Sequence, residues 1–329
     1  MSARTTLGID IGGTNIKGGV LDDQDRLLAR SAVETRADEG FEASFARIVA
    51  LIDELIAAAG VSRNAIAAVG VGVPGPMDHA AGVVRHAPNL DGWVNIPLRR
   101  LLTERTGLPC FVENDANAAA FGEFVGGTQR AATDMVMLTL GTGIGGGVIL
   151  GGRLVRGRFD NAGEVGHMIV ALGGRACPCG QRGCLERYAS ANAIRERLIE
   201  AVRAGEKSSL APAVYGSEPL TAEDVCRAAQ QGDEPSQRVW DEACRMLAAA
   251  CVNLQHVLNP GLIVLAGGLI NAGEALLGPV QSYFKELTWK ICEDFPRIEP
   301  AVLGGDAGLL GAAALAREAL LAAGAGHAR

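Results

Sequence analysis

A carboxylate closes an apolar strand-like segment at Glu113-Asn-Asp-Ala-Asn117, where the residue pattern changes from strand to helix. Asn114 is placed to cap that helix, which puts Asp115 in its first turn. The positive end of the helix dipole keeps such a carboxylate ionised near neutral pH. Asp115 is therefore a candidate catalytic base, placed to accept a proton from a hydroxyl group. The alternative is that both residues only cap the helix.

Three apolar segments end in glycine turns, at Gly12-Gly-Thr14, Gly141-Thr-Gly-Ile-Gly-Gly-Gly147 and Gly267-Gly268. Because glycine has no Cβ atom, backbone N–H groups at such turns can approach an anionic oxygen closely. The hydroxyl groups of Thr14 and Thr142 can donate further hydrogen bonds, and Asp10 is placed to hold magnesium through water. One glycine pair is usually a simple turn, but three that each end a strand favour phosphate binding.

The spacing of Gly141, Gly143 and Gly146 also matches the dinucleotide-binding fingerprint. That fingerprint requires a helix to follow, whereas the next residues are strand-like Val148-Ile-Leu150. The sequence contains no phosphate loop of the form GxxxxGK[ST]. The pattern therefore disfavours both a nicotinamide cofactor and a P-loop kinase.

A cluster of metal-ligand residue types lies in the second half, with the spacing H-x9-C-x-C-x4-C at His167, Cys177, Cys179 and Cys184. Three thiolates and one imidazole form a closed tetrahedral site for zinc. Because the four protein ligands leave no coordination position for water, the predicted zinc is structural rather than catalytic. Glu164 and Glu186 flank the cluster and are either solvated charges or partners for the hydroxyl groups of a ligand.

These residues are carried by a chain whose pattern alternates strands and helices. Strands are expected at about 7–11, 17–22, 67–73, 110–113, 135–140, 148–150 and 262–266. Helices are expected at 41–59, 98–106, 115–124 and 307–323. The sequence over 191–257 is also mostly helical in pattern. A strand, a glycine turn and a return strand occur twice, about 130 residues apart. This weak repeat predicts two related α/β halves.

The composition restricts the classes of function. The 329 residues are 48% hydrophobic and 20% charged, as in globular domains, and the net charge of −7 disfavours nucleic acid as a partner. We find no signal-peptide core and no apolar stretch long enough to span a membrane, so the sequence predicts a cytoplasmic protein without a membrane partner.

The motifs taken together resemble those of the ROK family, which comprises bacterial sugar kinases and related transcriptional repressors. The resemblance covers nearly the whole chain in the right order, through Asp10-Ile-Gly-Gly-Thr-Asn-Ile-Lys17, Val73-Pro-Gly-Pro76, Glu113-Asn-Asp-Ala-Asn117, Leu140-Gly-Thr-Gly-Ile-Gly-Gly146, Gly163-Glu-Val-Gly-His167 and the Cys-x-Cys loop. It implies the actin-like, ribonuclease-H-like fold of two α/β domains flanking a cleft. The expected domains are 1–118, completed by a C-terminal helix at about 305–323, and 119–304, which carries the zinc loop.

The resemblance also implies an enzyme, an ATP:hexose 6-phosphotransferase that uses ATP with Mg²⁺ and holds a structural Zn²⁺. Asp115 would be the base that activates the sugar 6-hydroxyl group. Sugar ligands would be Asn89, Asn114, Asp115, Glu164, His167 and Glu186. The nucleotide side would comprise Asp10, Gly12, Gly13, Thr14, Lys17, Thr142, Gly143, Gly267 and Gly268. His167 would bind zinc through one ring nitrogen and face the sugar with the other.

Among substrates, glucose is expected first, because the loop resembles that of family glucokinases. N-acetylglucosamine, N-acetylmannosamine, fructose and allose remain alternatives, as does polyphosphate as the donor. A sugar-responsive repressor is disfavoured, since those relatives carry a helix-turn-helix domain ahead of the first glycine turn and here the first strand begins near residue 5. A sugar-binding protein without catalysis is the remaining alternative. Family members are usually homodimers, sometimes homotetramers.

Overall fold

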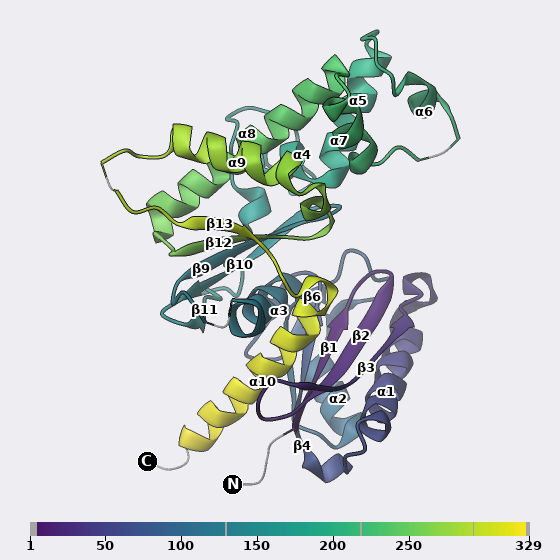
Figure 1. Cartoon of the computed structure of the whole chain (residues 1–329). Helices are drawn as coiled ribbons and strands as arrows, with labels where there is room; N and C mark the ends of the chain where they lie inside the picture. The colour runs from purple at the N-terminus through teal and green to yellow at the C-terminus, as the bar shows by residue number, and fades with distance from the viewer. Residues whose placement is uncertain (1–4, 129, 218, 292, 327–329) are drawn as a thin grey trace. The chain divides into compact units, whose positions relative to one another are not determined.

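The computed structural model describes residues 5–128, 130–217, 219–291 and 293–326. The chain divides into two compact units (Figure 1). Unit 1 comprises Met1–Ala131, Gly147–Gly163 and Val302–Arg329, and unit 2 comprises Ala132–Gly146 and Glu164–Ala301. The domain boundary expected from the sequence, at residue 118, differs from this division in two ways. Residue 118 lies inside the helix Asp115–Gly122, and residues 147–163, expected in the second domain, belong to unit 1.

Unit 1 is built on a five-stranded sheet with the order β3-β2-β1-β4-β8. β1 (Thr5–Ile11), β4 (Ile66–Val73) and β8 (Cys110–Asn114) are parallel, while β2 (Asn15–Leu21) and β3 (Leu27–Glu34) run antiparallel to their neighbours. The carboxyl ends of the three parallel strands therefore meet at one edge of the sheet. This edge carries Asp10, Val73 and Asn114.

Helices cover this sheet through apolar stripes. α1 (Gly40–Ala58) buries Ile48, Leu51, Ile52 and Leu55, which recur at helical spacing. α2 (Leu98–Thr106) and α3 (Asp115–Gly122) follow at the positions expected from the sequence, and α3 continues into a π-helical turn at Glu123–Gly127.

The last helix, α10 (Ala307–Gly326), belongs to unit 1 and packs against β1, β4 and α3. It lies very close to the sheet. A Cβ atom on Gly8 would lie 1.9 Å from the Leu309 carbonyl oxygen, and one on Gly70 would lie 1.8 Å from that of Ala312. Glycine is therefore required at both positions, and the expectation that the terminal helix packs on the first half is correct.

The second five-stranded sheet has the order β11-β10-β9-β12-β13. Its strands are β9 (Met135–Leu140), β10 (Ile144–Leu150), β11 (Arg153–Leu154), β12 (Leu262–Ala266) and β13 (Arg297–Pro300). Numbered along the chain, both sheets have the order third, second, first, fourth, fifth. The repeat suspected from two glycine turns is therefore a repeat of whole sheets, and a strand follows Gly141–Gly143, as expected.

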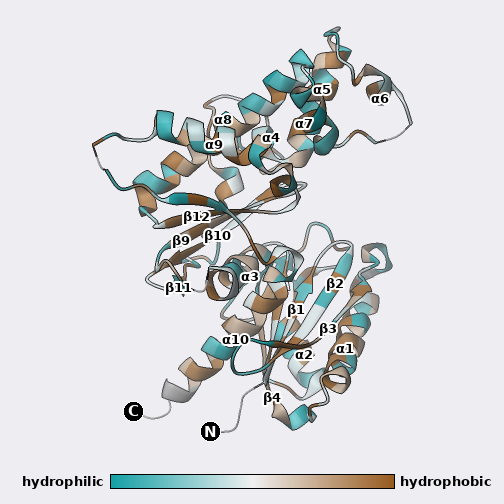
Figure 2. Ribbon diagram, in the orientation of Figure 1, coloured by the Kyte–Doolittle hydropathy of each residue, from teal (hydrophilic) through white to brown (hydrophobic). Residues whose placement is uncertain are grey.

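The helices of unit 2 are α4 (Glu186–Ala189), α5 (Ala191–Arg203), α6 (Ala211–Tyr215), α7 (Ala222–Gln230), α8 (Glu234–Leu258) and α9 (Glu274–Leu287). Figure 2 shows hydrophobic residues concentrated on β9 and β12 and on one side of the helices. A small sheet of β5 (Met77–Asp78), β6 (Val83–His86) and β7 (Val94–Ile96) was not expected from the sequence. Among the described residues, no helix is long and apolar enough to cross a membrane.

Candidate functional site

The junction of β8 and α3 is organised by hydrogen bonds to backbone N–H groups. The Asn114 side chain caps the helix by accepting from the N–H groups of Ala116 at 3.0 Å and Asn117 at 3.1 Å. Asp115 Oδ1 accepts from the Ala116 N–H at 2.8 Å. The cap confirms the expected start of the helix. It also places the Asp115 carboxylate, half-buried, at the carboxyl edge of the parallel strands.

Two carboxylates meet at this edge. Gly72 of β4 pairs with Asp10 of β1, and a Cβ atom on Gly72 would lie 3.5 Å from Asp115 Cα and 3.7 Å from Asp10 Oδ1. Burial and the negative charge of Asp115 raise the pKa of Asp10 to about 6, against the opposing effect of Lys17. Two acids this close favour a bound cation, which would keep both ionised.

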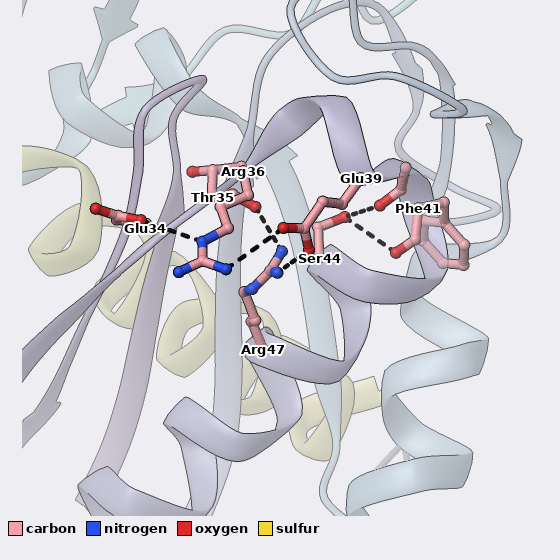
Figure 3. A network of polar contacts seen from close by, with 8 residues as sticks. Glu34, Thr35, Arg36, Glu39, Phe41, Ser44 and Arg47 are labelled. Atoms are coloured by element: carbon pink, nitrogen blue, oxygen red, sulfur yellow. Dashed lines mark hydrogen bonds and ion pairs between the residues drawn. The ribbon is translucent and has the colours of Figure 1, made fainter.

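The first glycine turn is held by Thr35. The Thr35 hydroxyl donates to the Gly12 carbonyl at 2.6 Å, and the Thr35 N–H donates to the Thr14 carbonyl at 2.8 Å. Thr35 is fully buried, and its own carbonyl accepts from Arg47 Nη1 at 3.0 Å. Figure 3 shows this bond and the surrounding ion pairs of Arg36 and Arg47 with Glu34 and Glu39. The turn is therefore braced by a polar network from β3 to α1.

Two other predicted residues lie beside this turn. The Lys17 ammonium group donates to the Gly305 carbonyl at 3.1 Å, so it faces the start of α10. A Cβ atom on Gly13 would lie 3.5 Å from Asn89 Cβ. Unit 1 therefore brings a predicted sugar ligand next to a predicted nucleotide-binding turn.

The second glycine turn is held by a carboxylate. Glu186 Oε2 accepts from the Ile144 N–H at 2.8 Å, and a Cβ atom on Gly143 would lie 2.5 Å from the same oxygen. Thr139 Oγ1 accepts from the Gly145 N–H at 3.1 Å, while Thr142 is exposed. Glu186, expected as a sugar ligand, thus contacts the turn expected to bind phosphate.

The third turn follows β12, and Gly268 lines a cavity of 480 Å³ within unit 2. Its other walls include Glu223, Arg227 and Gln230 of α7 and Leu269 and Asn271 after the turn. A volume of this size falls in the usual range for small-molecule sites. The cavity therefore has room for part of a ligand bound at the turn.

The predicted zinc ligands come together in unit 2. Ligand atoms of His167, Cys177, Cys179 and Cys184 all lie within 4.8 Å of one another. Cys177 Sγ is 3.8 Å from His167 Nδ1, and Cys179 Sγ is 3.6 Å from Cys184 Sγ. A tetrahedron with metal–sulfur bonds of about 2.3 Å has edges of about 3.8 Å, so these separations suit zinc.

Two of the three thiols in the cluster hold their protons more tightly than an ordinary cysteine does. Burial raises the pKa of Cys177, and burial raises that of Cys184 to about 12, while the backbone N–H of Gln181 lowers the pKa of Cys179. Zinc binds thiolates, so a metal would have to displace protons from the two buried thiols. Glu164 is exposed just before the short 3-10 helix Val165–His167, and its carbonyl accepts from the His167 N–H at 3.1 Å.

Sequence reasoning did not assign a role to Glu113, Arg156 or Thr35. Glu113 is 5% exposed, and its Oε2 lies 2.7 Å from both Arg156 Nε and Arg156 Nη2. An acid that closes an apolar strand requires a partner, because an unpaired buried carboxylate is costly. That signal was present at Glu113, but nothing in the sequence identified Arg156 as the partner.

Comparisons with known sequences and structures give the relatives of this chain. The sequence profile of the ROK family matches residues 6–319. The chain is 36% identical to a glucokinase of Halalkalibacterium halodurans, over 97% of this chain and 96% of that one. Its fold is similar to that of a ROK hexokinase of Thermus thermophilus, with a TM-score of 0.82 at 36% identity over 97% and 99% of the two chains.

A ROK family glucokinase of Streptomyces griseus, solved with glucose and AMPPNP, gives a TM-score of 0.75 at 37% identity over 95% and 99% of the two chains. The match of the family profile to nearly the whole chain, the two sheets of identical strand order and the similar solved structures all point to one family. The chain has the actin-like α/β fold of these sugar kinases and belongs to the ROK family.

Proposed function

We propose that this protein is a glucokinase, which transfers the γ-phosphoryl group of ATP to the 6-hydroxyl group of glucose. The observation that carries the proposal is the placement of Asp115 in the first turn of α3, beside Asp10 and the first glycine-turn strand. The similarity of the whole chain to glucokinases of 36–37% identity supports glucose as the substrate.

In this mechanism Asp115 orients the attacking 6-hydroxyl group and accepts its proton as the phosphoryl group arrives. The N-terminal end of α3 favours the ionised form of the carboxylate. The side chains proposed to bind sugar hydroxyl groups are those of Asn89, Asn114, Glu164, His167 and Glu186.

The nucleotide would bind through backbone N–H groups of the glycine turns. Thr14 and Thr142 are exposed, so their hydroxyl groups are open to a phosphate. The cavity lined by Gly268 and α7 has the size for the nucleoside part of ATP. Asp10 would hold Mg²⁺ through water, and that ion supplies neutralisation of the β- and γ-phosphate oxygens.

The test is an assay of ADP release from Mg-ATP with glucose, mannose, fructose, N-acetylglucosamine, N-acetylmannosamine and allose. We expect turnover with glucose and at most one or two others. Turnover with an N-acetylhexosamine and not with glucose would reassign the substrate. Silence across the panel, in folded protein with metal bound, would overturn the kinase proposal in favour of a sugar-binding protein or a donor other than ATP.

We also propose that His167, Cys177, Cys179 and Cys184 hold a structural zinc ion that fixes the His167 ring. Cys179→Ser should release the metal and lower the melting temperature, because metal binding is coupled to folding. Cys251→Ser is the matched control, since Cys251 is a fully buried thiol of α8 that is not one of the four clustered residues. Metal analysis that finds about one zinc per chain in both variants would refute the ligand set.

The family resemblance further supports a homodimer or homotetramer located in the cytoplasm. Light scattering coupled to size-exclusion chromatography measures the assembly directly. A mass near 34 kDa, the mass of one chain, would contradict this part of the proposal.

A further inference from the structure

Glu113 is a buried acid for which the proposed mechanism has no use. It lies at the end of β8, next to Asn114 and two residues before Asp115, and it is only 5% exposed. A buried carboxylate is tolerated when it is paired and its oxygens accept hydrogen bonds. Its contacts therefore indicate what it does.

One oxygen of Glu113 is bound to the start of α3. Oε1 accepts from the Asn114 N–H and from Asn117 Nδ2, both at 3.1 Å. The Asn114 N–H belongs to the residue whose side chain caps the helix, immediately before Asp115. Glu113 Oε1 therefore fixes the backbone on which the proposed base is mounted.

The other oxygen is bound to a distant segment of the same unit. Oε2 accepts from Arg156 Nε and Nη2, each at 2.7 Å, and lies 3.7 Å from His79 Nδ1. Arg156 belongs to the irregular segment that follows β11. A guanidinium group with two nitrogens on one carboxylate oxygen is a strong, directional partner.

That segment is anchored at a second point. Asp160 Oδ2 accepts from the His79 N–H at 3.0 Å, and His79 Nδ1 lies 3.1 Å from the Val112 carbonyl oxygen. Residues 156–160 are thus tied to both Glu113 and His79, and through them to β8. The segment that carries Arg156 is therefore anchored through Asp160 as well as through the Arg156 side chain.

We propose that Glu113 and Arg156 form a positioning pair that holds Asn114 and Asp115 in the orientation needed for phosphoryl transfer. This inference rests on the proposed function, in which Asp115 is the base. Arg156 balances a buried negative charge two residues from Asp115, and Glu113 transmits that anchoring to the helix start. Misplacement of a reacting group by about 1 Å can cost about a hundredfold in rate.

The pair is tested with Arg156→Met, Glu113→Gln, the double variant and Arg156→Lys. Arg156→Met leaves a buried carboxylate unpaired, so we expect kcat with glucose to fall by roughly 10- to 100-fold. The KM for Mg-ATP should change less than about threefold, because the pair acts through Asp115 and not on the nucleotide. Glu113→Gln keeps the shape and one acceptor oxygen for the Asn114 N–H and Asn117 Nδ2, but its amide nitrogen then faces the donors of Arg156, so kcat should also fall.

The double variant and the lysine variant supply the decisive comparison. The double variant contains no unpaired buried charge, so it should recover roughly tenfold in kcat relative to Arg156→Met. Arg156→Lys should recover part of the activity because it keeps the charge. If Arg156→Met does not fold, Glu113→Gln and Arg156→Lys still carry the test.

Arg317→Met is the matched control, since Arg317 is a half-buried arginine of unit 1 paired with Asp25. It should lower the melting temperature without changing kcat. If Arg156→Met behaves in the same way, or if the double variant is no faster than Arg156→Met, the pair is only a structural ion pair and the proposal is wrong. An inactive wild type would overturn the proposed function, whereas an active wild type with unaffected variants would overturn this inference alone.

Discussion

The two glycine turns at β1–β2 and β9–β10 occupy the same place in two sheets of the same strand order, yet they are held differently. The first is braced by the neutral Thr35, whose hydroxyl donates to the Gly12 carbonyl and whose N–H donates to the Thr14 carbonyl. The second is braced by the Glu186 carboxylate, which accepts from the Ile144 N–H. β1, the strand before the first turn, also carries Asp10. β9, the strand before the second turn, has only apolar residues and Thr139.

This difference shows that two sheets with the same strand order can carry side chains of different charge at equivalent turns. In unit 1 the carboxylates Asp10 and Asp115 lie at the strand ends, where they favour a cation and can accept a proton. In unit 2 the acid is already engaged with backbone N–H, and the exposed Thr142 hydroxyl and the glycines favour an anion. The base and the magnesium site are therefore expected in the first half alone.

The largest effect should come from removing the base. Asp115→Asn should lower kcat by at least about a hundredfold, the usual contribution of a general base, with a modest effect on glucose affinity. Steady-state kinetics and calorimetric binding of glucose measure the two quantities separately. If the variant turns over near the wild-type rate, Asp115 is not the catalytic base. The proposal that the first half alone supplies the base would then be wrong as well.

The second effect concerns the raised pKa of Asp10. Because the folded state holds the Asp10 proton more tightly than the unfolded chain does, the fold loses stability as the pH rises from about 4 to about 6, and the loss is complete above that range. Asp10→Asn should therefore increase the free energy of unfolding by about 1–3 kcal/mol at pH 8 without Mg²⁺, and by about half as much at pH 5. Denaturant titrations at the two pH values measure this.

An Asp10→Asn variant that is less stable than wild type at pH 8, or that gains equally at both values, would contradict the account of Asp10. Repeating the titration with Mg²⁺ sharpens the comparison. A cation bound by Asp10 should stabilise the wild type more than the variant.

The third effect tests the carboxylate brace of the second turn. A Cβ atom on Gly143 would lie 2.5 Å from Glu186 Oε2, whereas one on Gly141 would lie 3.9 Å from its nearest neighbour, the Gly143 carbonyl oxygen. Gly143→Ala should displace Glu186 and lower kcat/KM for glucose roughly tenfold, and Gly141→Ala should change it less than about twofold. Equal effects of the two substitutions would show that the position of Glu186 is unimportant.

The smallest effect tests the neutral brace of the first turn. Thr35→Val removes the hydrogen bond to the Gly12 carbonyl, which is worth about 0.5–1.5 kcal/mol. We expect the KM for Mg-ATP to rise about two- to tenfold with kcat nearly unchanged. Thr103→Val is the control, because the exposed Thr103 makes the same kind of bond within α2, from its hydroxyl to the Arg99 carbonyl. A KM unchanged in both variants would leave Thr35 without a role at the turn.

Local patterns in the sequence predicted much of this arrangement. Apolar runs that end in glycine located β1, β9 and β12, and the spacing of one histidine and three cysteines located a cluster that the fold assembles. These signals are visible in sequence because each depends on residues less than about 20 positions apart. The cap at Asn114 was visible for the same reason.

Contacts between distant segments were not predictable in this way. Asp10 lies near Asp115 because β1, β4 and β8 are parallel neighbours, in a register that places Asp10 beside Gly72 and Asn114 beside Val73. Arg156 reaches Glu113 across 43 positions, and no periodicity links the two. Strand order and register decide such pairs, so the buried acid was visible in the sequence while its partner was not.

The most direct test of the central claim is to identify the product. Phosphorus and carbon NMR of a reaction with Mg-ATP and glucose distinguish phosphate on the sugar from free phosphate. The account predicts glucose 6-phosphate and ADP in equal amounts, and loss of both with Asp115→Asn. ADP accompanied by inorganic phosphate, or phosphate attached to another hydroxyl group, would contradict it.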